Sequence, residues 1–241
     1  MASGQIVFFD LASKPPNKSW SLNPWKTRFV LNFKGLDYKT EWLQYPDIKP
    51  RFKDHFPADK EEFTIPTVTL PDGTWIMDSW EIAETLEKQK PEPSLHLDAP
   101  VLQTVIDLTT KATIELIPIF AARTPKLILD EPSIPYWYET REKKLGAHPD
   151  KLEQEKGGDR AISAATPHLQ AATALLKEKS DGPFFLGATP SYADFVWAGF
   201  LIFMSKLGDD TKEAVFNATG DAAAQEKLLE AVKPWSARDD H

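Results

Sequence analysis

The sequence contains no cysteine among its 241 residues. Disulfides, thiolate metal sites and a cysteine nucleophile are therefore excluded, and any thiol chemistry must use the thiol of a ligand. Long apolar runs are also missing, because the longest uncharged one, residues 195–204, is far shorter than the roughly 20 residues of a membrane-spanning helix. The N-terminal stretch has no basic lead, and its apolar run ends at Asp10, which is atypical of a secretion signal. We expect a cytoplasmic protein without a membrane partner.

The chain also has no excess of basic over acidic residues. The chain has 28 Lys and Arg against 36 Asp and Glu, a net charge of -8, which repels polyanions and disfavours nucleic acid as a partner. No metal-ligand spacing is present, so no metal site is expected. The histidines, including His55, His96, His148 and His168, stand in no nucleophile-type motif, which argues against a serine hydrolase. Small molecules and proteins remain as partners.

The first part of the chain has the pattern of a small α/β unit. An apolar run at residues 6–11 and an alternating one at 38–43 predict strands, and the turn Pro71-Asp72-Gly73 predicts a hairpin between strands at 67–70 and 74–77. A helix is predicted from Pro24 to a stop at Gly35, with Asn23 as its N-cap. Residues 44–63 are irregular, and a second helix covers 79–90.

Behind a proline-marked linker at residues 89–97, the strand signals stop. Apolar residues recur at spacings of three or four over 101–119 and 162–176, and further helical segments cover 136–145, 191–207 and 221–232. The segment Ser191 to Asp194 is a capping box at a helix start. We predict two domains, an α/β unit at residues 1–92 and an all-helical unit at 93–241.

Two short motifs suggest a site for a zwitterionic peptide. The sequence Thr64-Ile-Pro-Thr-Val68 places Pro66 before a strand, and a cis bond there would free the backbone of Ile65 to pair with an extended peptide; base rates alone favour an ordinary trans proline. Asp78 and Ser79 precede a helix and are first of all an N-cap pair, but the same geometry lets Ser79 and the helix N–H groups receive a carboxylate while Asp78 faces an ammonium group.

A third motif lies at the beginning of the first helix, in the stretch SWSLNPWKTR. The hydroxyl of Ser21, two residues before Asn23, is placed near the positive end of that helix. A hydroxyl donor there would hold the thiolate of a ligand and lower the thiol pKa, which is about 8.5 in water. The alternative is that Ser21 only caps the helix or is a loop residue without a role in binding.

Taken together, these motifs resemble the cytosolic glutathione transferases over nearly the whole chain. SLNPWKTR is similar to their first-helix motif, TIPTV to their cis-proline loop, DSWEIAETLE to their γ-glutamyl site, and GPFFLGATPSYADFVWAG to their helix-start motif. The long loop before Ser21 and the segment NPWKTRFVLNFKGLDY most resemble the fungal etherase-related class and, more distantly, bacterial β-etherases that act on lignin-derived aryl ethers.

The resemblance implies a thioredoxin-like N-terminal domain that binds glutathione, an all-helical C-terminal domain that supplies an apolar second-substrate site, and a homodimer. It implies that Ile65 and Pro66 pair with the cysteinyl backbone of glutathione and that Asp78 and Ser79 take its γ-glutamyl end. Ser21 falls on the catalytic position, with Asn23 as the second candidate. The residue for the glycine carboxylate stays open among four candidates: Lys49, Arg51, Lys53 and His55.

The motifs are compatible with two functions, one of an enzyme and one of a binding protein. In the first, the protein is an enzyme whose bound glutathione thiolate attacks electrophilic or aryl-ether aromatic compounds. The absence of cysteine argues against a thiol reductase that forms its own mixed disulfide. In the second, the protein is a ligandin-type binding protein that stores or carries plant or wood-derived aromatics with little catalysis.

Overall fold

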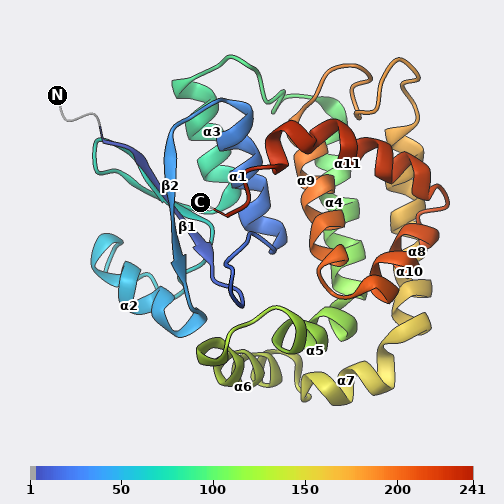
Figure 1. The fold of residues 1–241 in the computed structure, drawn as a ribbon, viewed down its shortest axis with the longest axis horizontal. Coiled ribbons are helices and arrows are strands. Elements are labelled where there is room, and N and C mark those ends of the chain that lie inside the picture. Colours follow the sequence, from blue (N-terminus) through green and yellow to red (C-terminus); the bar gives the residue numbers. More distant parts are fainter. Residues whose placement is uncertain (1–3, 241) are drawn as a thin grey trace.

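The computed structural model of the protein describes residues 4–240. Its N-terminal part is a four-stranded sheet in the order β2-β1-β3-β4, with β1 and β2 parallel and the other pairs antiparallel (Figure 1). The strands are β1 (Ile6–Leu11), β2 (Tyr38–Leu43), β3 (Thr67–Thr69) and β4 (Trp75–Met77), and the helices of this part are α1 (Leu22–Phe33), α2 (Ile48–Phe52) and α3 (Ser79–Gln89). This is the predicted thioredoxin-like arrangement.

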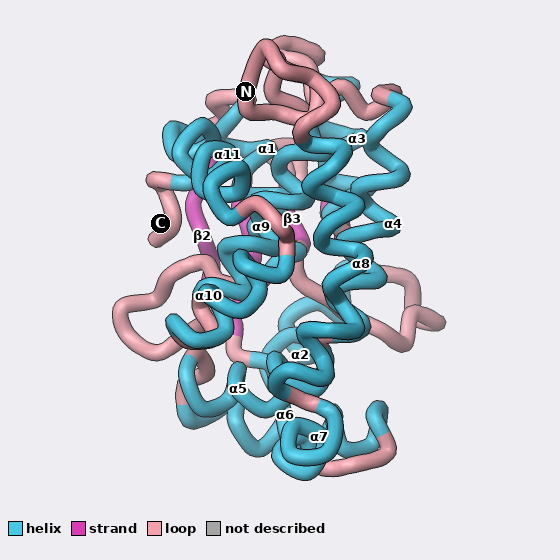
Figure 2. The backbone as a smooth tube through the Cα atoms, turned by 90° about the vertical axis from the view of Figure 1, so that its right-hand side faces the viewer, coloured by secondary structure: helices cyan, strands magenta, loops and turns pink. Residues whose placement is uncertain are grey.

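The remainder of the described chain is helical (Figure 2). Its helices are α4 (Pro100–Glu115), α5 (Ile117–Leu127), α6 (Ile134–Leu145), α7 (Pro149–Lys156), α8 (Gly158–Leu176), α9 (Tyr192–Ser205), α10 (Asp209–Ala218) and α11 (Ala222–Ser236). Short 3-10 turns occur at Tyr45–Asp47, Lys53–His55 and Glu131–Ser133. The fold class predicted from sequence is confirmed, while the boundary at residue 92 stays a prediction.

The two faces of the sheet are covered by different helices, as the alternation of side chains along β1 requires. Phe9 contacts Phe52 of α2, with ring centroids 5.2 Å apart. Asp10, on the opposite face, pairs with Arg28 of α1 at 2.9 Å. Helix α1 then joins the helical part, because Phe29 stacks on Phe195 of α9 with centroids 5.2 Å apart. The core therefore runs without a break from the sheet into the helical part.

Several predicted elements differ in their bounds. The periodic run 101–119 is two helices, because the backbone departs from helical geometry at Leu116, between α4 and α5. Helices α2, α7 and α10 were not predicted, since α2 has only five residues and α7 and α10 are short and mostly polar. The capping box of α9 is confirmed: Asp194 accepts hydrogen bonds from the Ser191 N–H and hydroxyl, both at 2.7 Å, and from the Phe185 N–H at 2.8 Å.

Candidate active site

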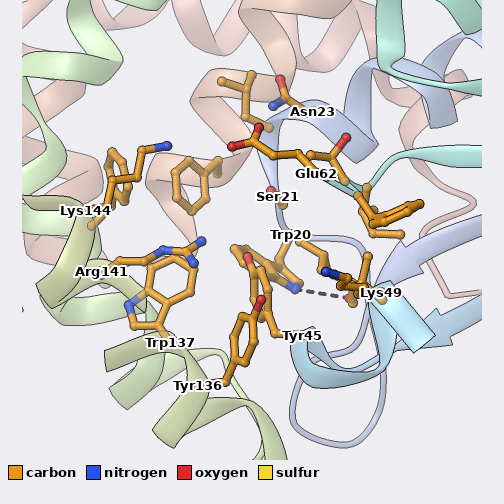
Figure 3. A pocket seen from close by; sticks show the side chains of 18 of the residues that line it. Trp20, Ser21, Asn23, Tyr45, Lys49, Glu62, Tyr136, Trp137, Arg141 and Lys144 are labelled. Atoms are coloured by element: carbon orange, nitrogen blue, oxygen red, sulfur yellow. Dashed lines mark hydrogen bonds between the residues drawn. The ribbon is translucent and has the colours of Figure 1, made fainter. Parts of the chain in front are cut away.

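A cavity of about 560 Å³ lies between the N-terminal part and the helical part (Figure 3). Its N-terminal wall comes from the beginning of α1, the segment 45–49 and the segment 61–65, and its other wall comes from α4, α5, α6 and α9. Part of its lining is apolar and aromatic, with Leu11, Trp20, Phe120 and Phe203 among the residues. A flat apolar molecule therefore fits beside the beginning of α1.

Ser21 lies at the N-terminus of α1 and lines this cavity. It is the N-cap residue, so the prediction that Asn23 caps the helix was wrong: the helix already begins at Leu22, and Pro24 falls in the first turn, where an N–H has no intrahelical partner in any case. The Ser21 hydroxyl makes no capping hydrogen bond, and no other partner occurs within residues 4–240. It is thus a free donor at the positive end of a helix.

The Ile65-Pro66 bond is cis, and Ile65 lines the same cavity as Ser21. Within residues 4–240, neither the N–H nor the C=O of Ile65 takes part in a backbone hydrogen bond. The Pro66 carbonyl accepts from the Asp78 N–H at 3.1 Å, which ties this loop to the beginning of α3. An extended peptide in the cavity would find a free backbone edge at Ile65.

Asp78 and Ser79 line a second cavity of about 360 Å³. Asp78 caps α3, since its Oδ1 accepts from the Trp80 N–H at 2.8 Å, and its φ of 87° lies in the left-handed region. Asn23 lines both cavities and Ser21 only the larger one. A ligand that spans the two cavities would therefore pass Asn23 on its way to Ser21.

Lys26 also lines the smaller cavity, and sequence reasoning did not find it. It forms no ion pair with any residue between 4 and 240, and burial lowers its pKa to about 8 against the opposing effect of Asp78. A helical lysine five residues after Ser21 carries no local signal that distinguishes it from a surface residue. Only the packing of α1 against α3 and α9 places it at the cavity.

The larger cavity also carries an aromatic and cationic cluster that sequence reasoning did not bring together. It consists of Tyr45 from the N-terminal part and of Tyr136, Trp137, Arg141 and Lys144 from α6, and we call it the Arg141 wall. The guanidinium carbon of Arg141 lies 3.9 Å from the centroid of the Trp137 ring and 5.1 Å from that of Tyr45. Burial raises the pKa of Tyr45 to about 12, so this phenol stays neutral.

The four basic candidates for binding the glycine carboxylate differ in their surroundings. Lys49 lines the larger cavity. Arg51 is paired with Glu41 at 2.7 Å, and His55 stacks on Trp75 with ring centroids 4.0 Å apart. Lys53 is exposed and lines neither of the two cavities. Lys49 is the candidate that faces the site.

Among residues 4–240, the structure brings together no group of three His, Cys, Asp or Glu side chains that could hold a metal ion. In the same range, no helix combines the length and the apolar character needed to cross a bilayer.

A thioredoxin-like sheet, a cis-proline loop and an all-helical second part around one cavity define the class of the two-domain glutathione-dependent transferases. Two family models agree with this: the N-terminal domain of glutathione S-transferase matches residues 20–89, and the C-terminal domain matches residues 102–235. The chain belongs to the glutathione S-transferase family, whose enzymes use glutathione as their co-substrate.

The chain is similar to several fungal proteins. The glutathione S-transferase CsGST63524 of Ceriporiopsis subvermispora, solved in complex with glutathione, is 31% identical, with a TM-score of 0.81 over 96% of this chain and 98% of that one. GSTFuA3 of Phanerochaete chrysosporium is 25% identical, with a TM-score of 0.79 over 96% and 97%. The glutathione S-transferase-like protein ustS of Aspergillus flavus is 28% identical over 81% of this chain and 79% of its own length.

Proposed function

We propose that this protein binds glutathione across its two cavities and activates the thiolate for attack on electrophilic or aryl-ether aromatic compounds. The observation that carries the proposal is the Ser21 hydroxyl, which lines the larger cavity at the N-terminus of α1 with no other hydrogen-bond partner in residues 4–240. A thiolate at that point gains a hydroxyl donor and the positive end of a helix, and both lower the thiol pKa.

The two cavities suit the parts of the tripeptide. The γ-glutamyl end belongs beside Asp78 and Ser79, where the carboxylate of Asp78 attracts the ammonium group and Lys26 attracts the carboxylate. The cysteinyl backbone pairs with the free edge of Ile65 next to Pro66. The glycine carboxylate lies nearest to Lys49.

The second substrate lies against the apolar part of the lining of the larger cavity. With a β-aryl ether, the thiolate attacks the carbon that bears the ether oxygen, the carbon–sulfur bond forms as the carbon–oxygen bond breaks, and a phenolate leaves and takes up a proton from water. The site contributes proximity and a stabilised thiolate. CsGST63524, in its complex with glutathione, supports the choice of the tripeptide.

The experiment that tests this function compares Ser21→Ala with the wild type in glutathione-dependent assays on chloroaromatic, isothiocyanate and β-aryl-ether substrates. Loss of one charge-assisted hydrogen bond predicts a fall in kcat/KM of about tenfold to a hundredfold. The pH profile of the rate should shift upward, because the thiol pKa rises when its donor is removed. Ser180→Ala, at an exposed position that lines neither of the two cavities, is the matched control.

The competing candidate is a ligandin-type binding protein for plant or wood-derived aromatics. The aromatic lining of the cavity favours it, since such a surface retains ligands whether or not they react. If Ser21→Ala leaves turnover unchanged, Asn23, which lines both cavities, becomes the catalytic candidate. If no substrate is turned over while phenolic compounds bind, the binding protein is the better description.

Two further parts of the proposal concern the whole protein. A homodimer and a cytoplasmic location both stay predictions. Light scattering at several concentrations tests the first, and fractionation of cells that express the protein tests the second.

A further inference from the structure

We propose that the Arg141 wall selects aromatic second substrates that carry a carboxylate, and that Arg141 is the residue that binds this carboxylate. The inference rests on the proposed function, because it names the substrate class for the same cavity. It goes beyond that function by assigning a charge to the substrate and a position to that charge.

The first argument is the electrostatic isolation of Arg141. Its side-chain hydrogen bonds are to neutral hydroxyls, to that of Thr140 at 2.9 Å and to that of Tyr45, and no carboxylate between residues 4 and 240 lies within ion-pair distance. On the neighbouring helix α5, Arg123 pairs with both Glu153 and Asp210, at 3.0 and 2.7 Å. A half-buried guanidinium has five N–H donors to satisfy, so donors that the protein leaves unused are available to a ligand.

The second argument is that Arg141 is held in one orientation. The guanidinium lies over Trp137 at 3.9 Å and beside Tyr45, and Trp137 is in turn fixed by a hydrogen bond from its Nε1 to the Ala121 carbonyl at 2.8 Å. Stacking on aromatic rings leaves the edge of the guanidinium free, and that edge is the part that binds a carboxylate through two parallel hydrogen bonds. The donor is thus fixed before a ligand arrives.

The third argument is the division of the cavity between charge and apolar surface. Figure 3 shows Arg141 and Lys144 on one side of the cavity and Ser21 across from them. Phe120 and Phe203, whose ring centroids lie 5.5 Å apart, line the cavity with them. A ligand with an apolar ring and an anionic group at one edge matches this division.

The acidic residues on the opposite wall set a limit on the anion. Glu61 and Glu62 belong to the N-terminal wall, and Figure 3 shows Glu62 reaching into the opening across from Arg141 and Lys144. Neither glutamate forms an ion pair with a cation in residues 4–240. Glu62 therefore repels an anion without occupying Arg141, and its removal should strengthen anion binding.

The experiment compares two substrates that share one ring and differ in the charge of one group, chloronitrobenzoate and its methyl ester, with each rate divided by that of free glutathione with the same compound. The wild type should prefer the acid. Arg141→Met should lower kcat/KM for the acid by about tenfold or more and leave the ester within about twofold. Arg141→Lys should fall between them, and Glu62→Gln should improve the acid. Arg160→Gln, which removes an exposed arginine of α8, is the control for overall charge.

A second measurement keeps the proposal testable without catalysis. Naphthoate and methyl naphthoate are titrated into protein loaded with S-methylglutathione, with tryptophan fluorescence as the readout. Tighter binding of naphthoate, lost in Arg141→Met, supports the proposal even where no substrate is turned over. Equal binding of acid and ester, or an ester turned over as well as the acid, overturns it while leaving the transferase function intact.

The carboxylate on Arg141 could also come from glutathione, and the assays separate the two sources. If Arg141→Met raises KM for glutathione and the glycine ethyl ester of glutathione is insensitive to the substitution, the anion is the glycine end of the tripeptide and the proposal is wrong. If KM for glutathione is unchanged, the anion belongs to the second substrate.

Discussion

Two arginines of this protein stand in opposite surroundings. Arg28 has a side-chain exposure of 0% and donates to Asp10, Ser19 and Thr40 at 2.9, 2.8 and 3.1 Å. Arg141 is half-buried at a cavity and has no carboxylate partner in residues 4–240. A buried charge that the protein itself neutralises holds elements together, whereas a charge left over at a cavity is available to a ligand.

The surroundings of Arg28, which we call the Arg28 network, join three distant segments. Asp10 comes from β1, Ser19 from the loop before α1, and Tyr38 and Thr40 from β2. Ser19 also donates from its hydroxyl to Asp10, and its N–H donates to the Asp239 carbonyl at 2.8 Å. Because Ser19 lies two residues before Ser21, this network fixes the loop that presents the catalytic candidate.

The largest predicted effect comes from breaking the Arg28 network. Arg28→Met leaves the Asp10 carboxylate buried without its cation, which predicts a loss of about 3–5 kcal/mol in the free energy of unfolding. Arg141→Met removes the cation–π contacts and hydrogen bonds to neutral hydroxyls, and it should lower the free energy of unfolding by less than about 1 kcal/mol. Urea unfolding of both variants measures the difference. Equal losses would remove the distinction between the two arginines.

A second buried charge, Asp194, tests whether the same rule holds in the helical part. Asp194→Asn weakens the capping box and the bond to Phe185, with an expected loss of about 1–3 kcal/mol. Burial raises the pKa of Asp194 from 3.8 to about 6, so the folded state favours its protonated form. The stability that this shift contributes is present below about pH 4 and is lost as the pH rises through about 6. Relative to Asp194→Asn, the wild type should therefore lose unfolding free energy across that window.

Truncation after Ser236 removes the contacts that the C-terminal residues make with the Arg28 network. It removes the Asp239 carbonyl that holds Ser19, the ion pair of Lys18 with Asp239 at 3.0 Å, and the Arg238 guanidinium that lies 3.8 Å from the Tyr38 ring centroid. We expect a loss of about 1–2 kcal/mol in unfolding free energy. Turnover should fall more than KM for glutathione rises, since the loop before Ser21 loosens. Lys18→Gln, which loses only the half-exposed ion pair, is the matched control and should leave turnover unchanged.

The sequence predicted the parts of the structure that local patterns determine. Strand β1 and strand β2 have the predicted bounds, because apolar and alternating runs specify buried strands directly. The capping box at Ser191 was predicted equally well from its local sequence. The beginning of α1 was placed two residues late, since Ser21 and Asn23 are both good N-caps and only the backbone decides between them.

The parts that sequence reasoning missed depend on tertiary packing. Tyr45 lies about ninety residues before Tyr136 in the chain, yet the two rings stack with centroids 6.1 Å apart. The spacing of Trp137 and Arg141, four residues apart on one helix, is the local signal that could have suggested the cation–π contact. That Arg141 has no acidic partner follows only from the packed structure.

The last prediction concerns Lys26, which shares features of both arginines: it is largely buried, like Arg28, and it has no ion-pair partner in residues 4–240, like Arg141. Burial lowers its pKa from 10.5 to about 8, so the folded state favours the neutral amine. A depressed lysine pKa makes the folded state gain stability as the pH rises from about 8 toward 10.5. The difference in unfolding free energy between the wild type and Lys26→Met should therefore increase across that window. Bound S-methylglutathione should abolish this increase, because a ligand carboxylate beside Lys26 restores the charge of its amine. An increase that persists with the ligand bound would place the γ-glutamyl carboxylate away from Lys26.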